Sequence, residues 1–199
     1  MPTRSLAFVG CNIGADVDRE VDAHDAIWLF EPIPEVAAAL LERYIDYRGK
    51  AIKIVNAACW SDSEPRRFHL YNRNGLSSSL GTVTQQAAEF FSAHDLDLLD
   101  SLWVRCTVLS EYLPIHLTKL IIDAQGADLA ILKTVEPWLE SGRIETIKVE
   151  CDGPGFQHYN GIGDNSQDSL LEYMGQFPYI AERVAQRRAE HPDWVFRVI

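Results

Sequence analysis

A glycine turn and a lone carboxylate follow two neighbouring apolar runs near the N-terminus. Residues 5–9 lead into a turn that contains Gly10 and Gly14, and residues 26–30 lead into Glu31. Glycines let a backbone approach a ligand closely, and free N–H groups at the start of a following helix attract anionic groups. A carboxylate at the end of the next strand can accept hydrogen bonds from both hydroxyls of a ribose. The pattern predicts a site for a nucleotide-like cofactor.

The spacing of the glycines separates two classes of cofactor. The turn has the form Gly-x-x-x-Gly, so it lacks the middle glycine of the Gly-x-Gly-x-x-Gly fingerprint, the one that makes room for a pyrophosphate. S-adenosylmethionine contains no pyrophosphate. The sequence therefore favours S-adenosylmethionine over NAD as the cofactor.

Two later apolar runs also end in carboxylates, at Asp123 and Glu150, and the glycine-rich loop that follows carries Asp152 and His158. Ligands of open α/β sheets bind beyond the carboxyl ends of the strands, where we expect these groups to lie. Asp123, Glu150, Asp152 and His158 are candidate bases, and we assign the catalytic role to Asp123, Glu150 and His158. Alternatively, Asp123 caps the next helix and His158 is an ordinary surface histidine. Asp123, Glu150 and Asp152 could also hold a hard divalent ion, but carboxylates at strand ends are common without ions. The other histidines, His191 among them, show no metal spacing, and we assign no metal ligands.

The elements that must position these groups alternate between short apolar runs and helix-like segments. This alternation is typical of βα units and a mostly parallel sheet. The sequence predicts an α/β fold with helices on both faces of the sheet and an antiparallel C-terminal hairpin. The predicted strands cover residues 5–9, 26–30, 50–55, 66–71, 103–108, 119–123, 144–149, 179–185 and 194–199. The predicted helices cover residues 15–24, 34–44, 84–100, 129–139 and 169–176.

The composition indicates one domain over residues 1–199, with 47% hydrophobic residues to fill its core. A net charge of -11 argues against nucleic-acid and anionic membrane partners, because proteins that bind phosphate backbones carry a basic face. The first apolar run leaves no room for a signal peptide, and no run approaches the about 20 residues of a spanning helix. Four cysteines without a Cys-x-x-Cys pair are expected to be reduced, so we expect a cytoplasmic protein.

Several blocks of the sequence, taken in order, resemble those of FkbM-family S-adenosylmethionine-dependent methyltransferases. The family has a Rossmann-like class I methyltransferase fold. The similar blocks are residues 10–14, 30–32, 56–58, 77–78, 120–128 with 132–133, and 149–150. The family usually has an acidic residue where this chain has Phe8, and Gln125 and Asp128 stand where it commonly has glutamate. Taken together the blocks are specific, whereas the glycine block alone is not.

The resemblance implies O-methylation of a hydroxyl on a small-molecule acceptor, a sugar or another natural product, or on a glycan. The cofactor-binding residues that it implies are Gly10, Asn12, Gly14, Glu31, Pro32, Ala58 and Ser78. In this interpretation the residues of the glycine turn surround the methionine part of the cofactor. Glu31 binds the ribose, Ala58 lies beside the adenine, and Ser78 borders the methyl donor. Asp123 then faces the acceptor, and Asp16 is a candidate to bind the amine in the absence of an acid at position 8.

Two other functions are compatible with the sequence. A catalytically degenerate binding module is suggested by Phe8 and Gln125, and a nucleotide- or NAD-binding Rossmann enzyme would fit the glycine turn less well. For the methyltransferase, we expect the loops at residues 75–101 and 152–163 to set the choice of acceptor. We expect a lid insertion around residues 75–101, which includes Phe90 and Phe91, to cover the site.

Overall fold

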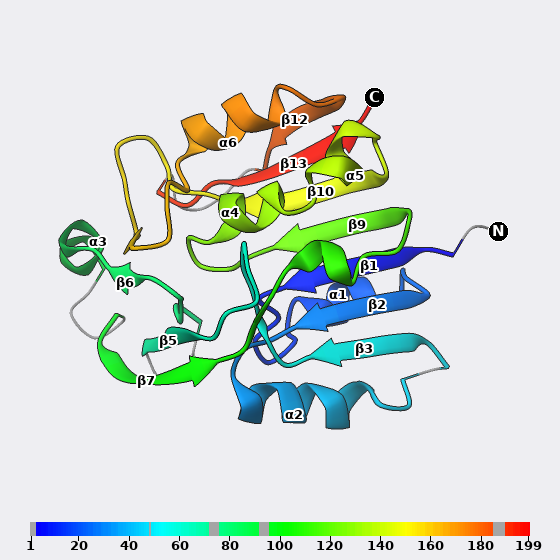
Figure 1. Ribbon diagram of the computed structural model, residues 1–199, viewed down its shortest axis with the longest axis horizontal. Coiled ribbons are helices and arrows are strands. Elements are labelled where there is room, and N and C mark those ends of the chain that lie inside the picture. The colour runs from blue at the N-terminus through cyan, green and yellow to red at the C-terminus, as the bar shows by residue number, and fades with distance from the viewer. Residues whose placement is uncertain (1–2, 48, 72–75, 92–95, 185–189) are drawn as a thin grey trace.

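A seven-stranded sheet forms the centre of the computed structural model, which describes residues 3–47, 49–71, 76–91, 96–184 and 190–199. The strands of this sheet are β1 (Ser5–Val9), β2 (Ala26–Phe30), β3 (Ala51–Val55), β9 (Leu117–Ile122), β10 (Ile144–Glu150), β12 (Tyr179–Arg183) and β13 (Asp193–Val198). Their order is β12-β13-β10-β9-β1-β2-β3 (Figure 1). Within this sheet β1, β2, β3, β9 and β10 pair in parallel, and β13 lies antiparallel between β10 and β12.

The register of the central strands brings their carboxyl ends to one level. Val9 of β1 lies opposite Phe30 of β2 on one side and Ile122 of β9 on the other. The residues that follow these three strands therefore meet at one edge of the sheet. Because the chain leaves β1 toward β2 and later returns to place β9 on its other side, this edge is a topological switch point, where open α/β sheets bind ligands.

Helices cover both faces of the sheet, because the side chains of each strand alternate between two cores. In β1, Leu6 and Phe8 pack into one core with residues of α1 and α2, and Ala7 and Val9 pack into the other with residues of α4, α5 and α6. The helices are α1 (Val17–Val21), α2 (Pro34–Tyr44), α3 (Gln85–Phe90), α4 (Asp128–Lys133), α5 (Glu136–Glu140) and α6 (Gln167–Met174), with a 3₁₀ turn, η1 (Leu109–Glu111).

Three small sheets lie on the side to which the central parallel strands point (Figure 1). They pair β4 (Ala58–Cys59) with β8 (Cys106–Thr107), β5 (Arg66–Tyr71) with β7 (Leu98–Val104), and β6 (Thr82–Val83) with β11 (Tyr159–Asn160). These short pairs, together with α3, build a layer over the carboxyl edge of the main sheet.

The structure confirms the predicted α/β class, the mostly parallel sheet and the antiparallel C-terminal hairpin. The helix predicted over residues 34–44 begins and ends at those residues, because proline at its start and alanine and leucine within it favour helix. Strand 66–71 is antiparallel as predicted, although it belongs to a small sheet rather than to the main one. All four cysteines are buried and free.

Three helix predictions were wrong in extent. The helix predicted over residues 84–100 ends at Phe90, and its last residues belong to β7, where pairing with β5 overrides their polar composition. The helix predicted over residues 129–139 is two helices, α4 and α5, because Pro137 in the first turn of α5 has no N–H to continue the hydrogen bonds of α4. Residues 15–24 form only the short α1. Residues 75 and 92–95 of the predicted lid and residue 185 of the predicted strand 179–185 lie outside the described residues.

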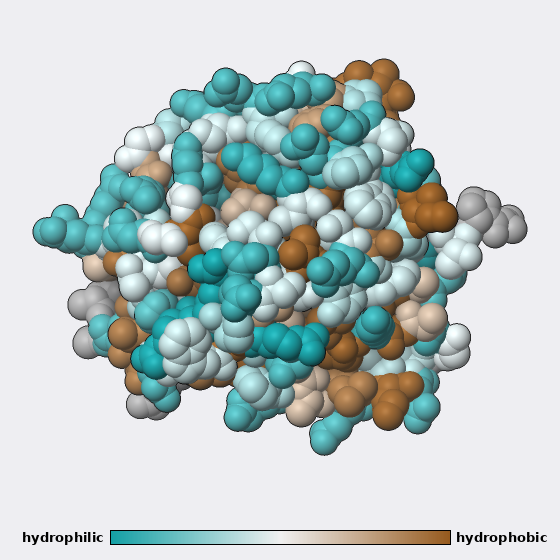
Figure 2. Space-filling view, viewed as in Figure 1, coloured by the Kyte–Doolittle hydropathy of each residue, from teal (hydrophilic) through white to brown (hydrophobic). Residues whose placement is uncertain are grey.

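The surface drawn in Figure 2 is mainly hydrophilic, with hydrophobic residues scattered over it rather than gathered in one patch. None of the helices among the described residues has the length and apolar character needed to cross a membrane.

Candidate functional site

A cavity of about 250 Å³ lies at the carboxyl ends of β1, β2 and β9. Its floor is the glycine turn after β1, one wall is the segment that follows β2, and another is formed by residues 123–127 after β9. Further surface comes from residues 57–59 and from Phe68, Leu76, Ser78 and Leu80. The cavity thus lies at the switch point of the sheet, where the sequence predicted the cofactor.

The glycine turn adopts backbone conformations that require glycine at two positions. Gly10 has φ +81°, and a Cβ there would lie 1.8 Å from the carbonyl oxygen of Asp123, so only glycine allows the turn to rest on the end of β9. Gly14 has φ +84°, and a Cβ there would meet Leu40 and Tyr44 at 3.0 Å. Gly10 lines the cavity, whereas Gly14 packs the turn against α2 and does not line it.

Two backbone N–H groups fix the side chain of Glu31, which directly follows the carboxyl end of β2. The N–H of Asn12 donates to Oε2 at 2.9 Å, and the N–H of Ile33 donates to Oε1 at 2.8 Å. The residue is only 3% exposed, and burial raises the pKa of its carboxyl group to about 7, while the two N–H groups lower it. Each oxygen keeps a further lone pair, so the pair of oxygens can still accept two hydroxyls from a ligand.

The lining of the cavity suits an apolar ring and a positive charge. Phe8, Phe30 and Phe68 contribute apolar surface. Among the lining residues that the structure describes, the charged ones are Asp16, Glu31 and Asp123, and all three are acidic. Such a lining disfavours a pyrophosphate but is compatible with the sulfonium and ammonium groups of S-adenosylmethionine. The residues that line the cavity therefore fit S-adenosylmethionine better than NAD.

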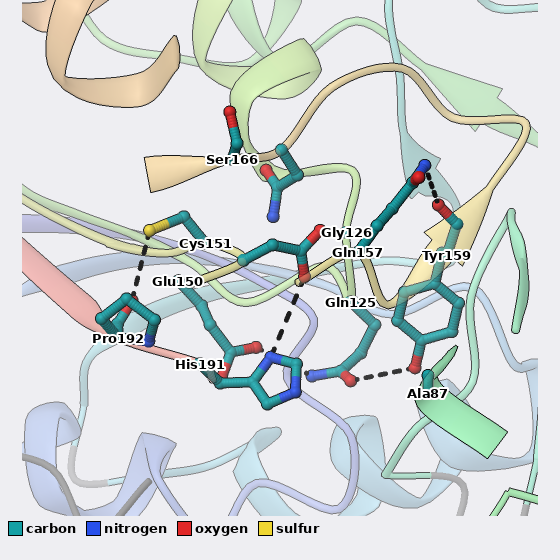
Figure 3. Close-up of polar contacts among 12 residues, drawn as sticks. Ala87, Gln125, Gly126, Glu150, Cys151, Gln157, Tyr159, Ser166, His191 and Pro192 are labelled. Atoms are coloured by element: carbon teal, nitrogen blue, oxygen red, sulfur yellow. Dashed lines mark hydrogen bonds and ion pairs between the residues drawn. The ribbon is translucent and has the colours of Figure 1, made fainter. Parts of the chain in front are cut away.

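A side-chain amide joins the two carboxylates that follow β9 and end β10. Nε2 of Gln125 donates to Oδ1 of Asp123 at 2.7 Å and to Oε2 of Glu150 at 3.3 Å. Oε1 of Gln125 lies 3.2 Å from the hydroxyl of Tyr159 (Figure 3). Burial raises the pKa of both carboxyl groups, and the charge of Asp123 raises that of Glu150 further. Asp123 lines the cavity, whereas Glu150 lies behind it and reaches it only through Gln125.

Asp128 shapes the loop that carries Asp123 and Gln125. Its two carboxylate oxygens accept the backbone N–H groups of Ala124 at 3.0 Å and Gly126 at 3.1 Å, and its side chain is completely buried. No side chain caps α4, so the alternative in which Asp123 serves as a helix cap is wrong. Asp123 is therefore left to face the cavity.

The structure brings together seven of the ten predicted site residues around the cavity: Gly10, Asn12, Glu31, Pro32, Ala58, Ser78 and Asp123. Gly14, Glu150 and His158 do not line it. His158 is only 6% exposed, so its interpretation as a surface histidine is wrong. The catalytic roles of Asp123, Glu150 and His158 stay predictions.

The sequence did not single out Phe68 and Leu80, which also line the cavity. Both belong to the layer above the main sheet, and neither type of residue carries a chemical signal by itself. Phe90 and Phe91 do not line the cavity but pack against Phe156, with ring centroids 5.5 and 6.4 Å apart. Of the predicted lid, Leu76, Ser78 and Leu80 line the cavity, and the role of a lid stays a prediction.

The sequence matches no protein-family model and no curated protein. Solved structures with the same fold include Methyltransferase FkbM from Methylobacillus flagellatus KT, with a TM-score of 0.63 at 12% identity over 97% of this chain and 43% of that one. This chain thus spans less than half of that neighbour. An rRNA methylase from Streptococcus thermophilus gives 0.54 at 10% identity over 99% of this chain and 87% of that one. A Streptococcus mutans protein solved in complex with SAH gives 0.53 at 7% identity over 98% and 89%. The class I methyltransferase fold implied by the sequence resemblance is confirmed.

Proposed function

We propose that this chain is an S-adenosylmethionine-dependent methyltransferase that methylates a hydroxyl group of a small-molecule or glycan acceptor. The observation that carries the proposal is Glu31, a buried carboxylate fixed by two backbone N–H groups at a cavity whose described charged residues are all acidic. A ribose and a cationic donor together satisfy this arrangement. The complex of the Streptococcus mutans neighbour with SAH supports the same choice of cofactor.

Different residues of the cavity have different roles in the proposed reaction. Glu31 holds the ribose hydroxyls, and Phe8, Phe30 and Phe68 exclude water from the apolar part of the cavity. When bound, S-adenosylmethionine supplies an electrophilic methyl group, whose transfer to oxygen leaves S-adenosylhomocysteine (SAH). The acceptor hydroxyl loses its proton to Asp123, whose pKa is raised by burial and which lines the cavity. Gln125 fixes the orientation of the Asp123 carboxylate through its amide.

A groove beside the cavity supports a sugar-like acceptor. It measures about 300 Å³, and Leu80 lines both the groove and the cofactor cavity. Trp103 is 66% exposed in this groove, and the Arg67 guanidinium lies 5.9 Å from the centre of its ring. An exposed indole offers a flat apolar surface, and a guanidinium offers donors to hydroxyl or carboxylate oxygens. This combination suits one face of a pyranose ring.

The test is methyl transfer from isotopically labelled S-adenosylmethionine to a panel of hydroxyl-bearing acceptors, with ribosomal RNA included because one structural neighbour is an rRNA methylase. We expect label on the oxygen of a small-molecule or glycan acceptor. Asp123→Asn should lower kcat by about 100-fold or more and leave the Kd of SAH within about threefold. Asp100→Asn, which alters an exposed carboxylate of β7, is the matched control and should keep full activity.

Each other outcome identifies a different function. Label on RNA alone would contradict the proposed small-molecule or glycan acceptor. It would also contradict the expectation, based on the acidic net charge, that the chain does not bind nucleic acid. Tight binding of SAH without transfer to any acceptor would identify the catalytically degenerate module instead. In that case Asp123→Asn would have no activity to lose.

A further inference from the structure

Three side chains of metal-ligand type gather outside the cofactor cavity. Asp152 follows β10, His158 precedes β11, and His191 precedes β13, so they come from three separate segments. One ligand atom from each residue lies within 4.8 Å of the other two. Nδ1 of His191 is 4.0 Å from Oδ1 of Asp152, an ion pair that Figure 3 marks with a dashed line at the His191 ring. Within the described part of the chain this is the one such group of three.

The three side chains are buried, which makes the gathering costly unless a ligand completes it. Asp152 is 4% exposed and His158 6%, and the side chain of His191 is 14% exposed. Nε2 of His158 has no hydrogen-bond partner among the described residues, although its ring is buried. Buried polar atoms are nearly always satisfied, and such an imidazole nitrogen either donates an N–H to an acceptor or offers its lone pair to an ion.

The backbone holds the three residues in place before any ligand arrives. The N–H of Cys151 donates to Pro192, and the N–H of Gly153 donates to Glu190, so the segments on both sides of Asp152 and His191 are tied together. The carbonyl of His158 accepts the N–H of Thr84 at 2.9 Å. These backbone bonds explain why residues far apart in sequence come together.

Aromatic rings fix the orientations of the two imidazoles. Phe91 stacks on His158 with centroids 5.1 Å apart and ring planes 12° apart, and Tyr159 also stacks on His158, with centroids 4.2 Å apart. Phe156 meets the edge of His191 at 5.4 Å. Rings that are held in this way lose little freedom when they bind an ion, which is how metal sites are preorganised.

We propose that Asp152, His158 and His191 bind a divalent transition-metal ion through one carboxylate oxygen and two imidazole nitrogens. Imidazole ligands select ions such as Zn²⁺, Co²⁺ and Fe²⁺, whereas Mg²⁺ and Ca²⁺ prefer oxygen ligands alone. Metal–ligand distances of about 2.0–2.2 Å place tetrahedral ligand atoms roughly 3.4 Å apart. Small side-chain rotations therefore suffice to close the site from its present separations. Three protein ligands leave at least one coordination position open.

The metal site has a route to solvent, and it is connected through Tyr159 to residues at the carboxyl edge of the main sheet. Asp152 lines a polar pocket of about 360 Å³, through which an ion can enter. His158 is adjacent in sequence to Tyr159, whose hydroxyl contacts Gln125. The metal would thus lie near the hydrogen-bonded group of Asp123, Gln125 and Glu150 but outside the cofactor cavity. Its ligands differ from the all-carboxylate set of Asp123, Glu150 and Asp152 that the sequence suggested.

Calorimetric titration of the chelator-treated protein with Zn²⁺ tests the proposal. We expect one equivalent of Zn²⁺ to bind, with a Kd that an excess of Mg²⁺ leaves unchanged. His158→Ala and His191→Ala should each weaken binding by about 100-fold or more, because each removes a direct ligand. His116→Ala is the matched control. This half-exposed histidine precedes β9 and pairs with Glu145 of β10, at the opposite edge of the sheet, so its removal should leave the Kd unchanged.

A second measurement protects the test against variants that fail to fold. In the unaltered protein, imidazole nitrogen NMR signals should shift on addition of Zn²⁺ for two of the six histidines, and the Co²⁺-loaded protein should show the visible absorption of a low-coordinate site. No stoichiometric binding to the unaltered protein would overturn the proposal. So would binding that persists in folded His158→Ala and His191→Ala variants, since the aromatic cluster would then be a packing feature only.

Discussion

The affinity for SAH should rise steeply with pH between pH 5.5 and pH 8, because the ionised form of Glu31 is the one that accepts the ribose hydroxyls. The unliganded protein raises the pKa of this carboxyl group to about 7 by burial. Below that pH the proton occupies a lone pair that a ligand hydroxyl would otherwise use. Binding must then expel the proton, which weakens the observed affinity.

The size of the effect follows from the pKa. At pH 5.5 a group with a pKa of about 7 is roughly 3% ionised, and at pH 8 it is about 90% ionised, so the apparent Kd should fall about 30-fold over this range. Glu31→Gln cannot ionise and should show no such dependence. At pH 8 it should also bind SAH about 10- to 100-fold more weakly, because a hydrogen bond to a charged acceptor contributes about 1.5–3 kcal/mol.

Calorimetric titrations with SAH at several pH values provide the measurement. The ratio of the Kd of Glu31→Gln to that of the unaltered protein removes any titration of SAH itself, and this ratio should increase with pH. Glu35→Gln, which changes an exposed carboxylate one turn away on α2, is the matched control and should follow the unaltered protein. Parallel pH profiles for Glu31→Gln and the unaltered protein would refute the assignment of Glu31 to the ribose.

Three further predictions concern the stability of the scaffold, each measured by urea denaturation. The folded pKa of Glu31 lies above its unfolded value of about 4.5, so its contribution is complete below about pH 4.5 and is lost as the pH rises through about 7. Between pH 5 and pH 8 the free energy of unfolding of Glu31→Gln should therefore rise by up to about 3 kcal/mol relative to that of the unaltered protein. A difference between the two proteins that does not change with pH would contradict this. Gly10→Ala should lower the free energy of unfolding by at least about 2 kcal/mol, because its Cβ would collide with the carbonyl oxygen of Asp123; an unchanged midpoint would show that the turn is not packed as described. Asp128→Ala should cost about 2–3 kcal/mol, because two buried backbone N–H groups lose their acceptor, whereas a loss below 0.5 kcal/mol, roughly the scale of a surface substitution, would mean that water replaces the carboxylate.

The part of the site that sequence predicted well is the part built by strand ends. Apolar runs that stop at glycine or at a carboxylate mark both the strand and its carboxyl end, and parallel pairing then brings Gly10, Glu31 and Asp123 to one level. Local signals decide these positions. The helix over residues 34–44 was predictable for the same reason, since its proline and its alanines act within the helix itself.

The parts that were not predictable depend on contacts between distant segments. Residues 98–100 have a helix-compatible composition, but pairing with β5 makes them part of a strand. His191 shows no metal spacing along the sequence, and it approaches Asp152 only because backbone hydrogen bonds tie the two segments together. Periodicity and spacing along one segment carry no information about such pairs.

The most direct test of the central claim is a calorimetric titration of the unaltered protein with SAH and, in parallel, with NAD⁺ at pH 8. The buried carboxylate and the acidic lining predict saturable binding of one SAH per chain and no detectable binding of NAD⁺, whose pyrophosphate would face Asp16 and Asp123. Binding of NAD⁺ in preference to SAH, or the absence of heat with SAH, would contradict the account.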